Sequence, residues 1–215
     1  MMLGKADTLE ETPFEIARRE AFEEIGLPSA DHKLPHPLQV EHLCELPTSL
    51  ALTELGVVPC VALLHAGDDP TDPEENLMPR LDAKEVAAVF SAPFRQFLSE
   101  YFDKQTQMNK GPKWYKGYSG TWHDRSWRMH YFYIPRSVDR RTSSAGEPYK
   151  VFGMTARILV DAARIAYAEE PAFEYDSGVG DEDILRKLLE TSRMNVERKP
   201  GSHISREDMA KISKM

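Results

Sequence analysis

The pattern of hydrophobic and polar positions changes its period several times along the chain, and each change predicts an element. Apolar stripes at helical spacing predict helices over residues 13–25 and 154–168, and residues 94–102 and 181–193 are also predicted to be helical. Alternating or short continuous apolar runs predict strands over residues 38–46, 57–66, 85–93 and 126–135. Polar stretches predict loops over residues 47–56, 67–82 and 136–148. This mixture predicts an α/β fold.

The helix over residues 13–25 has a start and a stop signal. Thr12 is a good N-cap, and Glu15 stands three residues later, as a capping box requires. Pro13 suits the first helical position, and Gly26 is a typical stop. The local sequence therefore predicts both ends of this helix.

Three carboxylates share one edge of this helix. At about 100° per residue, Glu20, Glu23 and Glu24 project within an arc of roughly 100°. The repulsion between Glu20 and Glu24 costs about 0.2–0.5 kcal/mol, and Arg19 offsets part of it by reaching Glu23 or Glu15. Two interpretations follow. The edge is either a solvated acidic face or a site for a hard cation, because Mg²⁺ and Mn²⁺ prefer carboxylate and water oxygens.

Residues 19–27, REAFEEIGL, resemble the second half of the Nudix box, whose usual form is G-x5-E-x7-R-E-U-x-E-E-x-G-U with U aliphatic. Glu11 takes the position of the box glutamate. The first half differs, because Lys5 stands where glycine is expected and Gly4 lies one residue earlier. This lengthening, together with the residues GKAD, is similar to the coenzyme A diphosphatase branch of Nudix hydrolases. The resemblance favours the cation interpretation.

The resemblance also covers residues 81–98 and 152–166, and extends over most of residues 3–193. It implies a Nudix fold, with a mixed β-sheet sandwiched between α-helices. The implied activity is metal-dependent hydrolysis of the diphosphate bond of coenzyme A and its derivatives, giving 3′,5′-ADP and 4′-phosphopantetheine. The alternatives are a Nudix diphosphatase acting on NADH or ADP-ribose, and an inactive truncated module.

The same resemblance assigns roles to the helix. Glu20, Glu23 and Glu24 would hold Mg²⁺ or Mn²⁺, and Glu20 or Glu24 would contribute to activation of the attacking water. Arg19 would orient the carboxylates rather than touch the substrate. Together these four residues are the predicted catalytic set.

Further residues are implied outside the helix. Gly4 would shape the loop before it, and Lys5 would approach the phosphate groups. Nudix enzymes often use another carboxylate from a later loop, for which Glu74, Glu75 and Glu85 are the candidates.

A Nudix domain normally has strands before its box, whereas here the box begins at Gly4. We therefore expect residues 1–193 to form a Nudix domain whose first strands are missing, followed by a flexible tail over residues 194–215. Because those strands would help to position the box helix, we expect little activity from residues 1–215 alone.

Composition limits the functional classes. The net charge is −8, which argues against a general nucleic-acid binder. No apolar run approaches the ~20 residues that span a bilayer. Cys44 and Cys60 stand in or beside apolar runs and are interpreted as reduced core residues. The histidines lack a convincing ligand spacing and are interpreted as ordinary; they are His32, His36, His42, His65, His123, His130 and His203.

Residues 111–128 mix aromatic with basic side chains. Such a segment could stack an adenine ring and meet a 3′-phosphate. The alternative interpretation places Trp127 in a strand core and the rest in a surface loop.

The chain ends in Ser213, Lys214 and Met215. This tripeptide resembles the Ser-Lys-Leu peroxisomal address, with Met in place of Leu. The sequence therefore predicts a peroxisomal location and binding to the import receptor.

Overall fold

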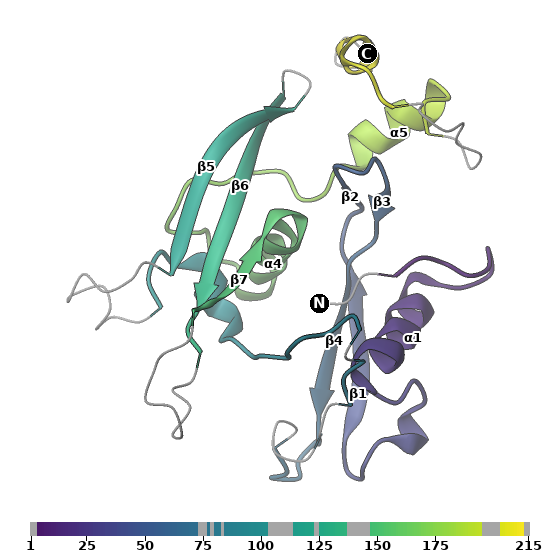
Figure 1. The fold of residues 1–215 in the computed structure, drawn as a ribbon, viewed down its shortest axis with the longest axis vertical. Helices are drawn as coiled ribbons and strands as arrows, with labels where there is room; N and C mark the ends of the chain where they lie inside the picture. The colour runs from purple at the N-terminus through teal and green to yellow at the C-terminus, as the bar shows by residue number, and fades with distance from the viewer. Residues whose placement is uncertain are drawn as a thin grey trace. The chain divides into compact units, whose positions relative to one another are not determined.

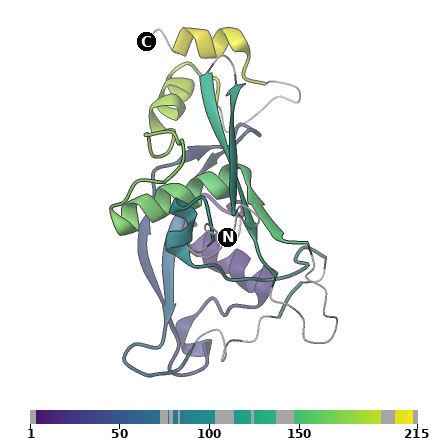
Figure 2. The same cartoon turned by 90° about the vertical axis from the view of Figure 1, so that its left-hand side faces the viewer.

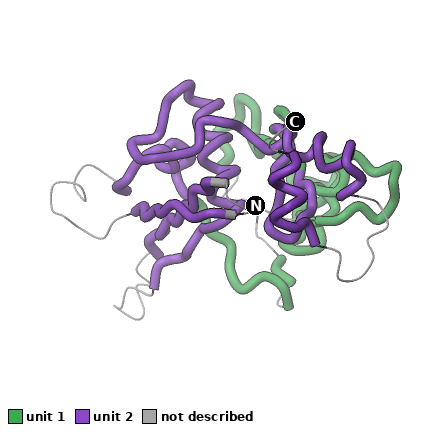
Figure 3. Tube along the Cα trace, turned by 90° about the horizontal axis from the view of Figure 1, so that it is seen from above, with its two compact units in different colours: residues 1–46, 58–91 green, residues 47–57, 92–215 purple. Residues whose placement is uncertain are grey.

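The computed structural model describes residues 4–72, 77, 80–82, 84–102, 114–122, 125–136, 147–194 and 203–212. It confirms the α/β class, since helices alternate with short β-sheets. The chain divides into two compact units, one of residues 1–46 and 58–91 and the other of residues 47–57 and 92–215 (Figure 3).

In the first unit, one long helix packs on a pair of strands. Helix α1 (Pro13–Ile25) is followed by a short 3₁₀ helix, η1 (Asp31–Lys33), and by strand β1 (Gln39–Glu45). Strand β4 (Cys60–His65) pairs antiparallel with β1, and α1 lies alongside the pair (Figure 1). The buried core cluster of this first unit consists of Leu34, Leu38 and Ala66. The sequence predicted the helix and both strands.

The pairing of β1 with β4 contains a bulge. His42 pairs with Ala62, whereas Cys44 pairs with Val61, so that Leu43 is an extra residue in β1. An extra residue reverses the side to which the following side chains point relative to a regular strand. Even-numbered positions before the bulge and odd-numbered positions after it therefore point to the same face of the β1–β4 pair.

The second unit contains a three-stranded antiparallel sheet in the order β5-β6-β7. Its strands are β5 (Tyr115–Trp122), β6 (Arg125–Ile134) and β7 (Tyr149–Phe152). Helix α4 (Gly153–Tyr167) covers one face of this sheet (Figures 1 and 2). Phe132 and Val160 are buried at this contact, and η2 (Phe94–Leu98) adds Phe97 to the same core.

A second core in this unit joins segments that lie far apart in the sequence. The elements are β2 (Ser49–Leu50), β3 (Gly56–Val57), α5 (Glu182–Glu190) and α6 (Arg206–Ile212). Its buried residues are Leu50, Ile184, Leu185, Leu188, Ile204, Met209 and Ile212. Residues 203–212 are thus not the flexible tail that their polar sequence predicted. Met209 and Ile212 lie three positions apart and share one helix face that contacts α5.

Several predicted elements differ in the structure. The described residues within 85–93 form no strand, because the amides of Glu85 and Val86 donate to the Asp82 carbonyl and close a turn. Of the helix predicted over residues 94–102, only the 3₁₀ segment η2 forms. Residues 115–122 form strand β5 rather than a surface loop, and Trp127 is half-buried in β6.

The described strands form three separate antiparallel sheets, β1-β4, β2-β3 and β5-β6-β7, instead of the single mixed sheet that the resemblance implied. Two adjacent strands with a short connection pair antiparallel, as β5 and β6 do, whereas parallel pairing needs a long crossover. None of the helices in the described residues is long and apolar enough to span a bilayer.

Candidate active site

Helix α1 forms the candidate site, and its ends are capped as the sequence predicted. The Glu15 amide donates to Thr12 Oγ1 at 3.2 Å, and the Thr12 amide donates to Glu15 Oε2 at 2.8 Å. At the other end Gly26 adopts the left-handed conformation with φ 71°, which glycine adopts at little cost. The carboxylates between these caps are therefore carried by a helix with defined ends.

Arg19 connects the carboxylates of the box. Its Nη1 lies 3.2 Å from Glu20 Oε1 and 3.5 Å from Glu23 Oε2, and its Nε lies 3.1 Å from Glu11 Oε1. Its Nη2 donates to the Lys5 carbonyl at 2.8 Å. The planar guanidinium holds several acceptors in fixed directions. Arg19 therefore orders the carboxylates and ties the preceding loop to the helix.

Gly4 lies directly against the side chain of Glu20. A Cβ atom at position 4 would stand 2.2 Å from Glu20 Cγ and 2.3 Å from Glu20 Oε1. Those distances are far shorter than van der Waals contact, so any other residue would displace Glu20. The side chain of Lys5 is exposed. The structure thus brings Gly4, Lys5, Arg19 and Glu20 together.

Glu24 is in a different environment from Glu23, which is exposed. Burial raises the pKa of the Glu24 carboxyl, and the negative charges of Glu20 and Glu85 raise it further. The segment that carries Glu85 is tied to the end of α1, because the Asp82 amide donates to the Glu24 carbonyl at 3.0 Å. Of the three candidate later carboxylates, Glu85 is the one that the structure describes, and its charge acts on Glu24.

The other two later carboxylates, Glu74 and Glu75, lie outside the described residues. A surface pocket of about 290 Å³ adjoins the site and is lined by Phe14, Glu15, Arg18, Arg19, Ser29, Asp31 and Val40. It includes Arg19 but none of the three predicted metal-binding carboxylates. The predicted metal site is therefore not part of this pocket.

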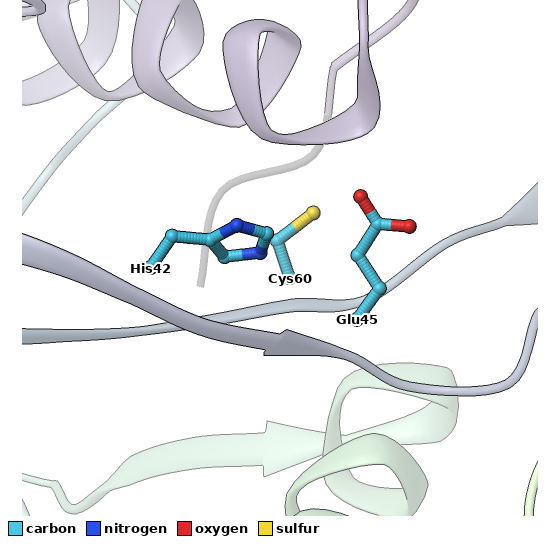
Figure 4. A group of neighbouring side chains, drawn as sticks. All are labelled: His42, Glu45 and Cys60. Atoms are coloured by element: carbon cyan, nitrogen blue, oxygen red, sulfur yellow. The ribbon is translucent and has the colours of Figure 1, made fainter.

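Sequence reasoning missed a second group of chemically active side chains in the same unit. His42, Glu45 and Cys60 each offer a ligand atom, and these atoms all lie within 4.8 Å of one another (Figure 4). His42 was interpreted as ordinary and Cys60 as a core residue. The interpretation of Cys44 as a core residue is wrong, because Cys44 is exposed. The spacing of His42, Glu45 and Cys60 in the sequence matches no motif, because a bulge and a strand pairing bring these residues together.

Comparison with known proteins gives relatives of one kind. The chain is 29% identical over 170 residues to the mitochondrial Nudix hydrolase 15 of Arabidopsis thaliana. It is 29% identical over 178 residues to the peroxisomal coenzyme A diphosphatase of Mus musculus, and 26% identical over 208 residues to peroxisomal coenzyme A diphosphatase 1 of Saccharomyces cerevisiae. No protein-family model matches the chain.

These alignments cover 79%, 83% and 76% of this chain, in the same order, but only 47%, 61% and 58% of the relatives. The chain thus spans about half the length of the curated relatives it matches. The resemblance that residues 19–27 predicted is confirmed, and over most of its length this chain is similar to Nudix hydrolases, among them peroxisomal coenzyme A diphosphatases.

Proposed function

We propose that this chain is a Nudix diphosphatase that hydrolyses the diphosphate bond of coenzyme A and its derivatives, giving 3′,5′-ADP and 4′-phosphopantetheine. The observation that carries the proposal is the edge of α1 on which Arg19 bonds to both Glu20 and Glu23. The substrate rests on the names of two relatives, which are coenzyme A diphosphatases. The complete Nudix fold, including strands before the box, is part of the proposal.

The donor set fits a hard divalent cation. Glu20, Glu23 and Glu24 offer only carboxylate oxygens from one helix edge, which suits Mg²⁺ or Mn²⁺. Such a cation supplies neutralisation of the negative charge that develops on the nonbridging phosphate oxygens. Burial, followed by the negative charges of Glu20 and Glu85, raises the pKa of Glu24, and a bound cation would offset those charges.

The chain's own residues would then divide the work. Arg19 holds Glu20 and Glu23 in place, and Lys5 approaches the phosphate groups from the preceding loop. Glu20 or Glu24 would take the proton of the attacking water, as the resemblance to Nudix hydrolases implies. Glu85 supports this role by adding to the negative field at Glu24.

The test replaces Glu24 by Gln, which removes the charge and keeps the shape. Mn²⁺ affinity measured by calorimetry should fall. In a chain extended by the strands that normally precede a Nudix box, the release of 4′-phosphopantetheine should drop about 100-fold or more. Glu10→Gln is the matched control, because it removes the same charge at an exposed position before the helix. Unchanged Mn²⁺ affinity in Glu24→Gln would contradict the assignment.

The substrate needs a separate comparison. Values of kcat/KM for coenzyme A, NADH and ADP-ribose should favour coenzyme A. A preference for NADH or ADP-ribose would contradict the proposed substrate but would still be consistent with a Nudix diphosphatase. Mn²⁺ binding without hydrolysis of any of the three would favour the inactive module.

The location stays a prediction. Two relatives are named peroxisomal and another is named mitochondrial. The predicted address, residues 213–215, lies outside the described residues, and binding to the import receptor is likewise a prediction.

A further inference from the structure

His42, Glu45 and Cys60 form a group of ligand atoms that includes none of the box carboxylates. One ring nitrogen, one carboxylate oxygen and the Cys60 Sγ lie within 4.8 Å of one another. Figure 4 shows the three side chains on the same side of the β1–β4 pair. We propose that these residues bind a borderline divalent cation of the Zn²⁺ type at a second metal site.

The bulge in β1 creates this grouping. In a regular strand His42 and Glu45 would point to opposite faces, because they are three residues apart. With Leu43 as the extra residue, His42 pairs with Ala62 and Glu45 pairs with Cys60. Since positions 60 and 62 of β4 share a face, all three side chains share it as well. Bulges are over-represented next to functional sites, where they redirect a side chain.

Two contacts hold the ligands in position before any metal binds. The imidazole of His42 stacks on the ring of Phe14 in α1, with 4.1 Å between ring centroids and 12° between ring planes. Glu45 stands directly opposite Cys60 in the ladder, and the Leu46 amide donates to the Pro59 carbonyl at 2.8 Å just beyond this pair. The backbone that carries Glu45 and Cys60 is therefore held by this hydrogen bond on one side of the pair and continues into the Cys44–Val61 pairing on the other.

The kind of ligand selects the cation. A set of one nitrogen, one oxygen and one sulfur suits Zn²⁺ and Co²⁺, whereas Mg²⁺ and Mn²⁺ prefer oxygen alone. Ligand atoms around tetrahedral Zn²⁺ are about 3.5 Å apart, so small side-chain rotations suffice to close the group. His42 and Glu45 are exposed, which leaves a path of entry, and Cys60 is half-buried. Three protein ligands leave a fourth position for water or another small ligand.

The chain offers a matched control for this site. Cys44 is the other cysteine, and it pairs with Val61, so its side chain points to the opposite face from Cys60. Co²⁺ added to the reduced full chain should produce a thiolate-to-cobalt charge-transfer band. That band should be lost in Cys60→Ser and kept in Cys44→Ser. It should also be kept in Glu24→Gln, which separates this site from the box.

A second measurement needs no variant. Alkylation of the wild-type chain, followed by peptide mass spectrometry, should show that Zn²⁺ protects Cys60 and leaves Cys44 reactive. His42→Ala and Glu45→Gln should each weaken Zn²⁺ binding about tenfold or more. Circular dichroism verifies that each variant folds.

Three results would overturn the proposal. Equal alkylation of Cys60 with and without Zn²⁺ is the first. The second is a cobalt band that survives Cys60→Ser or disappears in Cys44→Ser. The third is a band that disappears in Glu24→Gln while that variant stays folded, because Co²⁺ would then depend on the box carboxylates.

Discussion

At the scale of single residues, Gly4 shows how a missing side chain sets the position of a functional one. A Cβ at position 4 would stand 2.2 Å from Glu20 Cγ, so Gly4→Ala should push the Glu20 carboxylate out of place. Mn²⁺ affinity by calorimetry should fall, whereas the melting temperature should change little because Gly4 is exposed. Gly178→Ala is the control, since a Cβ there meets nothing within 4 Å. Unchanged Mn²⁺ affinity in Gly4→Ala would remove the steric argument.

A second prediction at this scale concerns His130, which is 2% exposed. Burial, together with the charge of Arg128, lowers the pKa of His130 from 6.5 to about 4. Because the folded-state pKa is the lower one, stability from neutral His130 is present above pH 6.5 and is lost as the pH falls to about 4. The loss amounts to as much as about 3 kcal/mol. Replacement by Gln removes this titration.

Urea unfolding at several pH values measures the effect as the difference between wild type and His130→Gln. The difference is needed because Asp161 acts in the opposite direction in the same range. Burial raises the pKa of Asp161 to about 6, so its contribution to stability is lost as the pH rises. Parallel pH profiles for the two proteins would show that His130 does not titrate as described.

At the scale of elements, α1 depends on its own cap. The Thr12 hydroxyl accepts from the Glu15 amide, and Thr12→Ala leaves that amide without its partner at the first turn. The free energy of unfolding should fall by about 1 kcal/mol, measured by chemical denaturation followed by circular dichroism. Thr8→Ala makes the same change at an exposed position before the helix and should cost much less. An equal loss of unfolding free energy in both variants would show that the Thr12 cap does not stabilise the helix.

At the scale of the whole molecule, the second core of the second unit depends on a segment near the end of the sequence. Met209 of α6 is 0% exposed and packs with Leu188 of α5. Met209→Ala should therefore cost about 2–5 kcal/mol and speed hydrogen exchange in α5. Glu207→Ala, at an exposed position of the same helix, should have little effect. A Met209→Ala variant as stable as wild type would restore the interpretation of this segment as a flexible tail.

The sequence by itself determined the elements whose signals are local. Helix α1 begins and ends at the predicted residues, and α4 lies within one residue of its prediction, because caps and helical periodicity act within a few positions. The box was in part local, since Glu20 and Glu23, two of the carboxylates that Arg19 bonds, lie within about one turn of it on the same helix. Of the two partners predicted for Arg19, the structure shows Glu23, whereas Glu15 bonds to Thr12.

Only the tertiary structure decided the features that depend on distant partners. Residues 85–93 carry an apolar run but form no strand, while β5 forms where its pairing with β6 buries Tyr115. Helix α6 is buried because α5 presents a complementary apolar face, which its own polar sequence does not reveal. The group of His42, Glu45 and Cys60 depends on one extra residue in β1, because a side chain's face follows from strand pairing and not from composition.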